Sequence, residues 1–405
     1  MSEDVRHGSV EGRLPGAVYW FGATSLANDF SSEIVYPLLP AFVTQTLGGG
    51  ALALGLVDGL GDAIAAGLKL VSGYLAERPR LRGPLVVAGY GLATVMRPLM
   101  AVATLPWHVI AVRAGDRVGK GLRTAPRDVM IADVTEPEMR GRAFGLHRVG
   151  DHTGAILGPL LAAALIAGGL SLRHVFWVAT VPGVVAVGLA WMAVRRVGAR
   201  DDVRGASGAG GRQPATDPLA PRTSSLAPLL AVLALAVFLR APETLLLLRT
   251  QQLGVAVAAV PLLWALLHVV RSTVSYPGGV LADRWGPRRT LAIGWMSYAA
   301  LAWALAKATS TVQAVVLFAA YGVVAALTES PERKLVAAAS SRARRGRGFG
   351  WYHGALAAVA LPGAALFGWL YQVLGADVAL EASAAVTLAA VALLGIVALI
   401  PGRSG

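Results

Sequence analysis

Long apolar stretches are the feature that most constrains this chain. Runs of about 20 predominantly apolar residues, long enough to cross the hydrocarbon core of a bilayer, recur from one end to the other. Of the 405 residues, 55% are hydrophobic and only 15% are charged, whereas roughly a quarter of the residues in a soluble domain are charged. The sequence therefore predicts an all-α protein that is embedded in a lipid bilayer and crosses it many times.

We predict twelve transmembrane helices from the apolar runs and the polar segments between them. Their ranges are 16–44, 51–76, 83–104, 107–133, 142–168, 173–195, 226–250, 255–282, 289–309, 312–339, 347–374 and 377–400.

Basic residues are concentrated in alternate connections. The connections after the second, fourth, eighth and tenth spans are rich in arginine, whereas residues 45–50 and 251–254, on the opposite side, carry no charge. Because positive residues are retained on the cytoplasmic side, this pattern predicts a multi-pass protein of the cell inner membrane with both termini in the cytoplasm. It also accounts for the formal net charge of +13 without a nucleic-acid partner.

The two parts of the chain repeat each other. Pro126 matches Pro331, and at the same offset RGRAFG (140–145) matches RGRGFG (345–350). Two parallel repeats with a binding site between them are typical of one large class of secondary transporters. The repeat therefore predicts two pseudo-symmetric six-helix bundles.

A polar segment separates the repeats. Residues 196–225 are rich in Gly, Pro and Arg and predict a flexible cytoplasmic linker. The expected domains are an N-terminal six-helix bundle over 1–195 and a C-terminal six-helix bundle over 226–405.

Several motifs resemble those of the major facilitator superfamily. GGVLADRWGPRR (278–289) is similar to the superfamily's loop signature, and its N-terminal copy has Glu77 in place of the aspartate. Arg113 occupies the place of the superfamily's fourth-helix arginine, and Gly158-Pro159 resembles the fifth-helix motif of the bacterial antiporter branch. The resemblance implies a secondary transporter, not an enzyme, that works by alternating access without a cofactor.

The resemblance also implies a gate on the cytoplasmic side, formed by the loop motifs and the basic residues beside them. The residues assigned to the gate and to the motifs are Gly73, Glu77, Gly279, Asp283, Arg284, Arg140, Arg345, Gly158 and Pro159.

Charged residues inside the predicted spans mark a candidate cavity. A charge at the centre of a membrane helix costs roughly 3 kcal/mol on insertion scales, so it normally faces a cavity or a partner. The candidates for the cavity and for proton coupling are Asp62, Asp116, Arg113, Lys69, Lys120, Asp58, Glu33, Asp29, Asp151 and Arg148. The same residues could instead form ion pairs that lock neighbouring helices together.

Two carboxylates rank first as proton carriers. Asp62 and Asp116 lie nearest the middle of the membrane by residue count, and each is within two helical turns of a cation. A carboxyl that exchanges protons must change its surroundings during transport. We expect at least one of these two to be the coupling acid, with Glu33 and Asp151 next.

Other chemistries are disfavoured by spacing. Residues 115–121 (GDRVGKG) resemble a phosphate-binding loop, but no strand precedes them and no Ser or Thr follows Lys120. His147 and His152 are the only close histidine pair with a spacing that suits metal ligands. We therefore predict neither a nucleotide nor a protein-bound metal.

The expected activity is proton-coupled efflux, that is antiport, of a small molecule by a monomer that uses the proton gradient. Gly158-Pro159 favours this direction. One alternative is a proton-coupled importer of an anionic metabolite, with Lys69, Arg113 and Lys120 as its counter-charges. Another is a transporter-like membrane sensor that moves nothing. No residue identifies the substrate.

Overall fold

The computed structural model describes residues 14–136, 139–206, 226–339 and 345–399. These residues form helices and no strands, because a helix satisfies its backbone hydrogen bonds within one segment and so tolerates a bilayer. The helices before residue 207 are α1 (Gly16–Val35), α2 (Leu39–Ala41), α3 (Ala51–Leu75), α4 (Pro79–Ala101), α5 (Pro106–Val134), α6 (Arg140–Ala167) and α7 (Leu172–Ala206). Those after residue 225 are α8 (Leu226–Phe238), α9 (Glu243–Gln252), α10 (Val260–Arg284), α11 (Pro287–Lys307), α12 (Thr311–Ala338), α13 (Arg345–Val373) and α14 (Ala376–Leu399).

Every range predicted as a span contains helical residues, but the helices differ in apolar character. By length and hydropathy, nine spans in the described part of the chain can cross a membrane. The helices α1, α5 and α11 are not among these nine, so the count of twelve spans stays a prediction. Helix α7 continues to Ala206, into the predicted linker, whose residues 207–225 lie outside the described residues.

Prolines break the first helix of each half. Pro37 and Pro40 cannot donate a backbone hydrogen bond, and the chain after α1 passes through a 3₁₀ turn (Tyr36–Leu38), α2 and a π-helical turn (Phe42–Thr46). In the second half, α8 ends at Phe238, and α9 begins only after Pro242. The interruption before Pro242 places an irregular segment of backbone beside the centre of the molecule.

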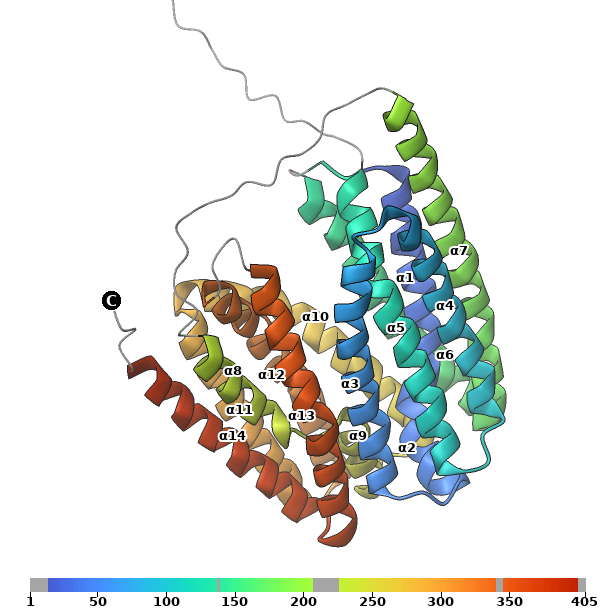
Figure 1. Cartoon of the computed structure of the whole chain (residues 1–405). Helices are drawn as coiled ribbons and strands as arrows, with labels where there is room; N and C mark the ends of the chain where they lie inside the picture. The colour runs from blue at the N-terminus through green and yellow to red at the C-terminus, as the bar shows by residue number, and fades with distance from the viewer. Residues whose placement is uncertain (1–13, 137–138, 207–225, 340–344, 400–405) are drawn as a thin grey trace, which may run out of the picture.

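The helices form two groups that lie side by side (Figure 1). In the first half, α1 packs against α6 and α7, α4 packs against α5 and α7, and α3 packs against α5. In the second half, α10 packs against α12, α11 packs against α12 and α14, and α8 packs against α13 and α14. The principal contacts between the halves join α3 to α13 and α6 to α10.

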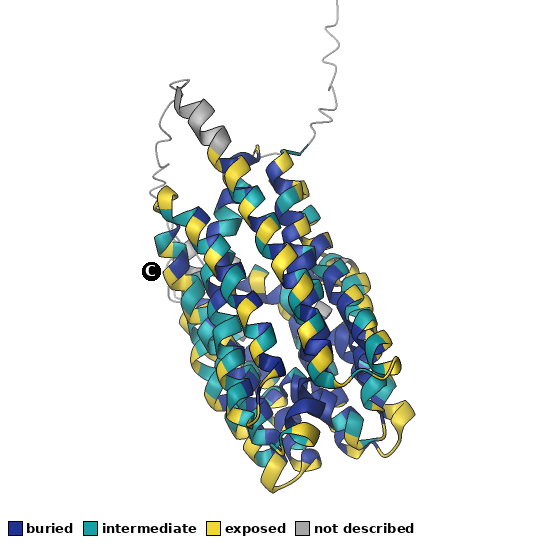
Figure 2. Ribbon diagram, turned by 90° about the vertical axis from the view of Figure 1, so that its right-hand side faces the viewer, coloured by how far each residue is buried: buried dark blue, intermediate teal, exposed yellow. Residues whose placement is uncertain are grey.

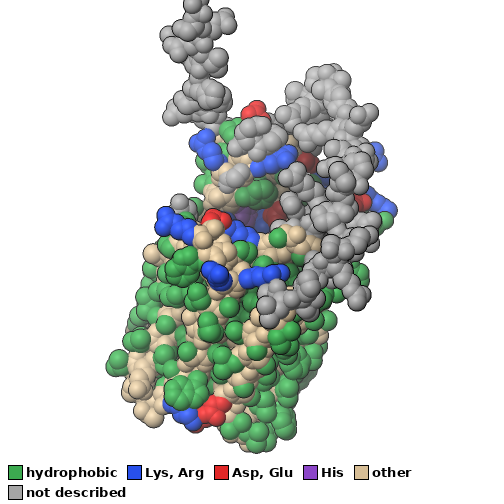
Figure 3. Space-filling model, turned by 90° about the vertical axis from the view of Figure 1, so that its left-hand side faces the viewer, with side chains coloured by type: hydrophobic (Ala, Val, Ile, Leu, Met, Phe, Trp, Pro, Cys, Tyr) green, Lys and Arg blue, Asp and Glu red, His purple; other side chains and the backbone are tan. Residues whose placement is uncertain are grey.

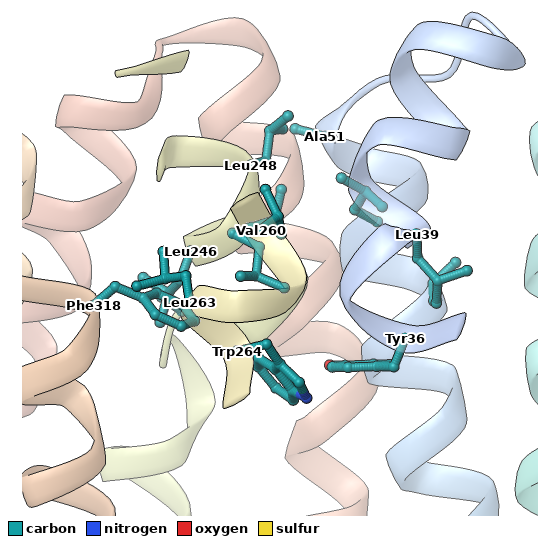
Figure 4. Packing of buried hydrophobic residues seen from close by; sticks show 14 of the residues in the cluster. Tyr36, Leu39, Ala51, Leu246, Leu248, Val260, Leu263, Trp264 and Phe318 are labelled. Atoms are coloured by element: carbon teal, nitrogen blue, oxygen red, sulfur yellow. The ribbon is translucent and has the colours of Figure 1, made fainter. Parts of the chain in front are cut away.

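Buried hydrophobic residues show where the halves meet. The largest cluster draws on both halves, with Tyr36 and Leu39 from the first and Leu248 and Trp264 from the second (Figure 4). Two smaller clusters each stay within one half. The halves therefore share a hydrophobic core at the end that carries the 47–50 and 253–256 connections, and they have separate cores at the other end.

Glycines allow the close approach of α3 to α13 at the shared end. A Cβ on Gly59 would lie 2.7 Å from the Cβ of Ala364, and a Cβ on Gly55 would overlap the carbonyl oxygen of Ala364. Small residues are the usual means by which membrane helices come into close contact. The outer faces of the helices, by contrast, carry exposed residues, many of them large and hydrophobic, as a lipid-facing surface requires (Figure 2).

Candidate functional site

A polar cavity lies between the two halves. It has a volume of about 530 Å³, and residues from both halves line it. Figure 3 shows acidic, basic and histidine side chains set into the hollow between the halves, above a surface that is largely hydrophobic. A cavity of this size suits a small molecule.

Seven of the ten predicted cavity residues line this cavity. They are Asp29, Glu33, Asp58, Asp62, Arg113, Asp116 and Lys120. They come from α1, α3 and α5.

The charged stripe of α5 forms one wall of the cavity. Arg113 Nη1 lies 3.4 Å from Asp116 Oδ2, which is the ion pair that their spacing of three residues predicts. The guanidinium of Arg113 also lies 4.6 Å from the centre of the Tyr36 ring. Arg113 is buried, so these contacts fix its guanidinium between Asp116 of its own helix and the 3₁₀ turn that follows α1.

Two carboxylates of the first half accept hydrogen bonds from the second half. Trp264 Nε1 donates to Glu33 Oε2 over 2.7 Å. Asp58 Oδ2 accepts from the hydroxyl of Thr244 at 2.7 Å and from its backbone N–H at 3.1 Å. The hydroxyl of Tyr36 donates to the other oxygen of Asp58 at 3.0 Å. These contacts lie where the cavity meets the shared hydrophobic core.

The opposite wall consists of residues that the sequence prediction did not include in the site. Arg271 of α10 forms ion pairs with Glu329 of α12 and, at 3.8 Å, with Glu243 of α9. The guanidinium of Arg240 lies 4.9 Å from the ring centre of Tyr298. Arg240, Glu243, Arg271 and Glu329 all line the cavity.

A sequence signal for this wall was available. Arg240 and Glu243 flank Pro242 within a predicted span, and interrupted helices near the middle of the membrane form binding sites in many transporters. His268 and Trp264 complete the wall, with their rings 5.0 Å apart.

Three predicted cavity residues lie elsewhere. Asp151 accepts a hydrogen bond from Ser25 of α1 and lies 3.4 Å from Nδ1 of His147, so it joins α6 to α1. Arg148 is exposed. Lys69 is half-buried and lies nearer than Asp58 to the C-terminal end of α3. None of the three is among the residues that line the cavity.

The predicted gate residues lie at the end where the halves have separate cores. Asp283 forms an ion pair with Lys334 of its own half, and Nε of Arg140 donates to the carbonyl of Ala132 at 3.2 Å. The other members are Glu77 and Arg284, which are exposed, Gly73 and Gly279, which are partly buried, and Arg345, whose side chain lies outside the described residues.

The Gly158-Pro159 motif lies inside α6 at its contact with α1. Both residues are buried, and a Cβ on Gly158 would overlap the carbonyl oxygen of Phe30. A Cβ there would also lie 3.2 Å from the Cβ of Glu33. The motif thus allows α6 to approach α1 closely beside Glu33, a carboxylate that lines the cavity.

The described part of the chain contains no group of three or more His, Cys, Asp or Glu side chains that could hold a metal ion. His147, one of the two histidines with suitable spacing, is instead buried beside Asp151.

The sequence matches the family model of the Major Facilitator Superfamily over residues 21–270 and 241–404. An uncharacterized protein of Mycobacterium tuberculosis is 30% identical over 91% of each chain, and an uncharacterized MFS-type transporter of Methanocaldococcus jannaschii is 29% identical over 88% of each. The multidrug resistance protein MdtH of Yersinia pestis is 31% identical over 39% of each chain.

Solved structures share the fold at low sequence identity. The nucleoside transporter NupG has a TM-score of 0.75 and 12% identity over 95% of this chain and 100% of its own. A bacterial homologue of the human lysosomal transporter Spinster, in an inward-facing and occupied conformation, has a TM-score of 0.69 and 14% identity over 94% and 95% of the two chains.

Proposed function

The chain belongs to the major facilitator superfamily and is therefore a membrane transporter of small molecules, not an enzyme; from this premise we propose that it exports its substrate in exchange for protons by alternating access. The observation that carries the proposal is the charged cavity between two halves that share a hydrophobic core at one end only. Rocking the halves about such a site would expose it to each side of the membrane in turn.

The open end of the molecule is the one that carries the basic connections. By the positive-inside rule this end faces the cytoplasm, so the conformation corresponds to an inward-open state. The cavity is lined within a single chain, which supports a monomer as the working unit.

Asp62 and Asp116 remain the proposed proton carriers. Asp62 is exposed to the cavity, and its side chain makes no hydrogen bond or ion pair within the described residues, so water can reach it. Asp116 is paired with Arg113, which can respond to a change in its charge. A carboxyl with access to water and a nearby cation has the surroundings that proton exchange needs.

Two features support export. One is the Gly158-Pro159 motif beside Glu33, and the other is the similarity of part of the chain to a protein named for multidrug resistance. Import of an anionic metabolite is the second candidate. It is favoured by Lys120, which lines the cavity without an ion pair among the described residues.

The test is solute flux in liposomes that contain the purified protein. Candidate solutes come from comparing the metabolites and toxic compounds retained by cells with and without the protein. We expect an imposed pH gradient to drive accumulation, and we expect Asp62→Asn or Asp116→Asn to abolish that response while leaving exchange intact. Asp133→Asn is the matched control, because Asp133 lies on α5 outside the cavity and pairs with Arg82.

Each outcome has a distinct meaning. If both variants respond to the gradient like the parent, the coupling acid is another residue, and Glu33 is next. If the parent moves solute without regard to pH, proton coupling is wrong. If no solute moves, the sensor alternative gains support.

A further inference from the structure

The cations of the α5 stripe differ in whether they have partners. Arg113 pairs with Asp116. Arg123 donates to the carbonyl of Gly89 at 3.3 Å and lies 4.4 Å from the centre of the Tyr90 ring. These contacts are made to residues of the same half, so they fix the positions of both arginines whatever the cavity contains.

Between these two arginines lie two cations without such partners. In the described ranges of the chain, the side chains of Arg117 and Lys120 make no hydrogen bond and no ion pair, and both line the cavity. They are three residues apart on one helix, so their side chains project from the same face. Like charges at this spacing repel each other and weaken the helix.

The carboxylates of the neighbouring helices do not neutralise this pair of cations directly. Asp29 of α1 and Asp62 of α3 line the same cavity, but neither forms an ion pair with Arg117 or Lys120. Asp29 instead accepts a hydrogen bond from the side-chain amide of Asn28 at 2.8 Å. A cation inside a membrane protein is costly unless it is paired or serves a function.

The opposite wall offers no equivalent pair. Arg271 is held by Glu243 and Glu329, and Arg240 lies against the rings of Tyr298 and Tyr321. The free positive charge of the cavity is therefore concentrated on α5, and an anionic group of a bound molecule would be drawn to that wall.

We propose that Arg117 and Lys120 together bind an oxyanion, a carboxylate or a phosphate, of the transported molecule. The planar guanidinium of an arginine can donate two parallel hydrogen bonds to such a group, and the ammonium of a lysine adds a compact charge. This assignment rests on the proposed transport function and names the substrate class as small organic anions or zwitterions.

The test is direct binding to the purified full-length protein in detergent. The probes are sodium acetate and inorganic phosphate, each titrated against sodium chloride at constant ionic strength, and the readout is the shift in thermal unfolding temperature. We expect at least one probe to raise the unfolding temperature of the parent, and Arg117→Gln and Lys120→Gln each to weaken the apparent affinity about tenfold or more, because a charged hydrogen-bond partner is lost. The probe that binds more tightly identifies the oxyanion.

Two further variants make the result decisive. Lys307→Gln is the matched control, because Lys307 pairs with Glu381 at the far end of α11 and does not line the cavity; it should respond like the parent. Lys120→Arg keeps the charge and should retain much of the shift. Lys120 is exposed to the cavity, so its variants should fold even if Arg117→Gln does not.

An equal response of the parent and Lys120→Gln to both probes, including no response in either, would overturn the proposal. The assay needs neither a pH gradient nor transport. A loss of binding in Lys120→Gln would therefore support the oxyanion site even if the liposome experiment rejected proton coupling.

Discussion

Replacing Thr244 by valine should open the closed end of the transporter. The Thr244 hydroxyl donates to Asp58 across the two halves at 2.7 Å. A hydrogen bond to a charged group contributes about 1.5–3 kcal/mol. Asp58 keeps its bonds from the backbone N–H of Thr244 and from Tyr36, so we take the lower value. A change of this size in the balance between two states corresponds to roughly tenfold in their ratio.

The assay uses a single cysteine, since the chain has none of its own. Leu39 is fully buried in the core that the two halves share (Figure 4), so Leu39→Cys should react with a membrane-impermeant maleimide only when that end is open. We expect Thr244→Val to raise the reaction rate about tenfold, provided that the rate follows the open population.

The matched control is Thr250→Val. Thr250 is also buried in α9, but its hydroxyl donates to the carbonyl of Leu247 within the same helix at 2.8 Å. Both atoms of that bond belong to the same half, so the bond exists in both conformations. Its loss should therefore leave the reaction rate unchanged. An unchanged rate in Thr244→Val, or an equal rise in Thr250→Val, would refute the assignment of this contact as a latch between the halves.

Three other perturbations test the fold and the gate. Gly55→Leu should open the closed end and raise the rate of the same maleimide reaction, because its side chain would overlap α13. Gly67→Leu should leave the rate unchanged, because a Cβ there meets nothing within 4 Å. Equal rates in the two variants would contradict the α3–α13 contact. Asp283→Asn should favour the inward-open state and slow transport with expression intact, since its charge is lost from the predicted cytoplasmic gate; unchanged accessibility of the cavity would show that Asp283 has only a structural role. Cysteines at Thr309 and Trp285, which are both exposed, should react from opposite sides of the membrane, and reaction from one side would reject the predicted topology.

Local features of the sequence were sufficient to predict several parts of the structure. The apolar runs predicted helices because a membrane helix satisfies its backbone hydrogen bonds internally, without help from its neighbours. The pair Arg113–Asp116 also followed from spacing along one helix. The repeat of the two halves and the charges of α1, α3 and α5 likewise pointed to a cavity between two bundles.

Rotation and depth of the helices relative to one another were not encoded in such local patterns. Asp58, Asp62 and Lys69 were all expected to line the cavity, yet only the two aspartates do so. Lys69 lies farther along α3, in a part of the helix that still contacts the other half: a Cβ on Gly350 of α13 would lie 3.6 Å from the side chain of Leu70. Asp151 was expected in the cavity, but the packing of α6 on α1 turns it toward Ser25.

What the sequence by itself determined is the membrane class, the helices and the charged stripes, because periodicity and hydropathy depend on residues close together in the chain. Tertiary structure alone decided which charges have partners on other helices. The contacts of Glu33 with Trp264 and of Asp58 with Thr244 join residues far apart in the chain, so no spacing rule reveals them. The same packing leaves Arg117 and Lys120 facing the cavity without a partner among the described residues, because an ion pair requires the opposing helix to present a carboxylate at the right depth.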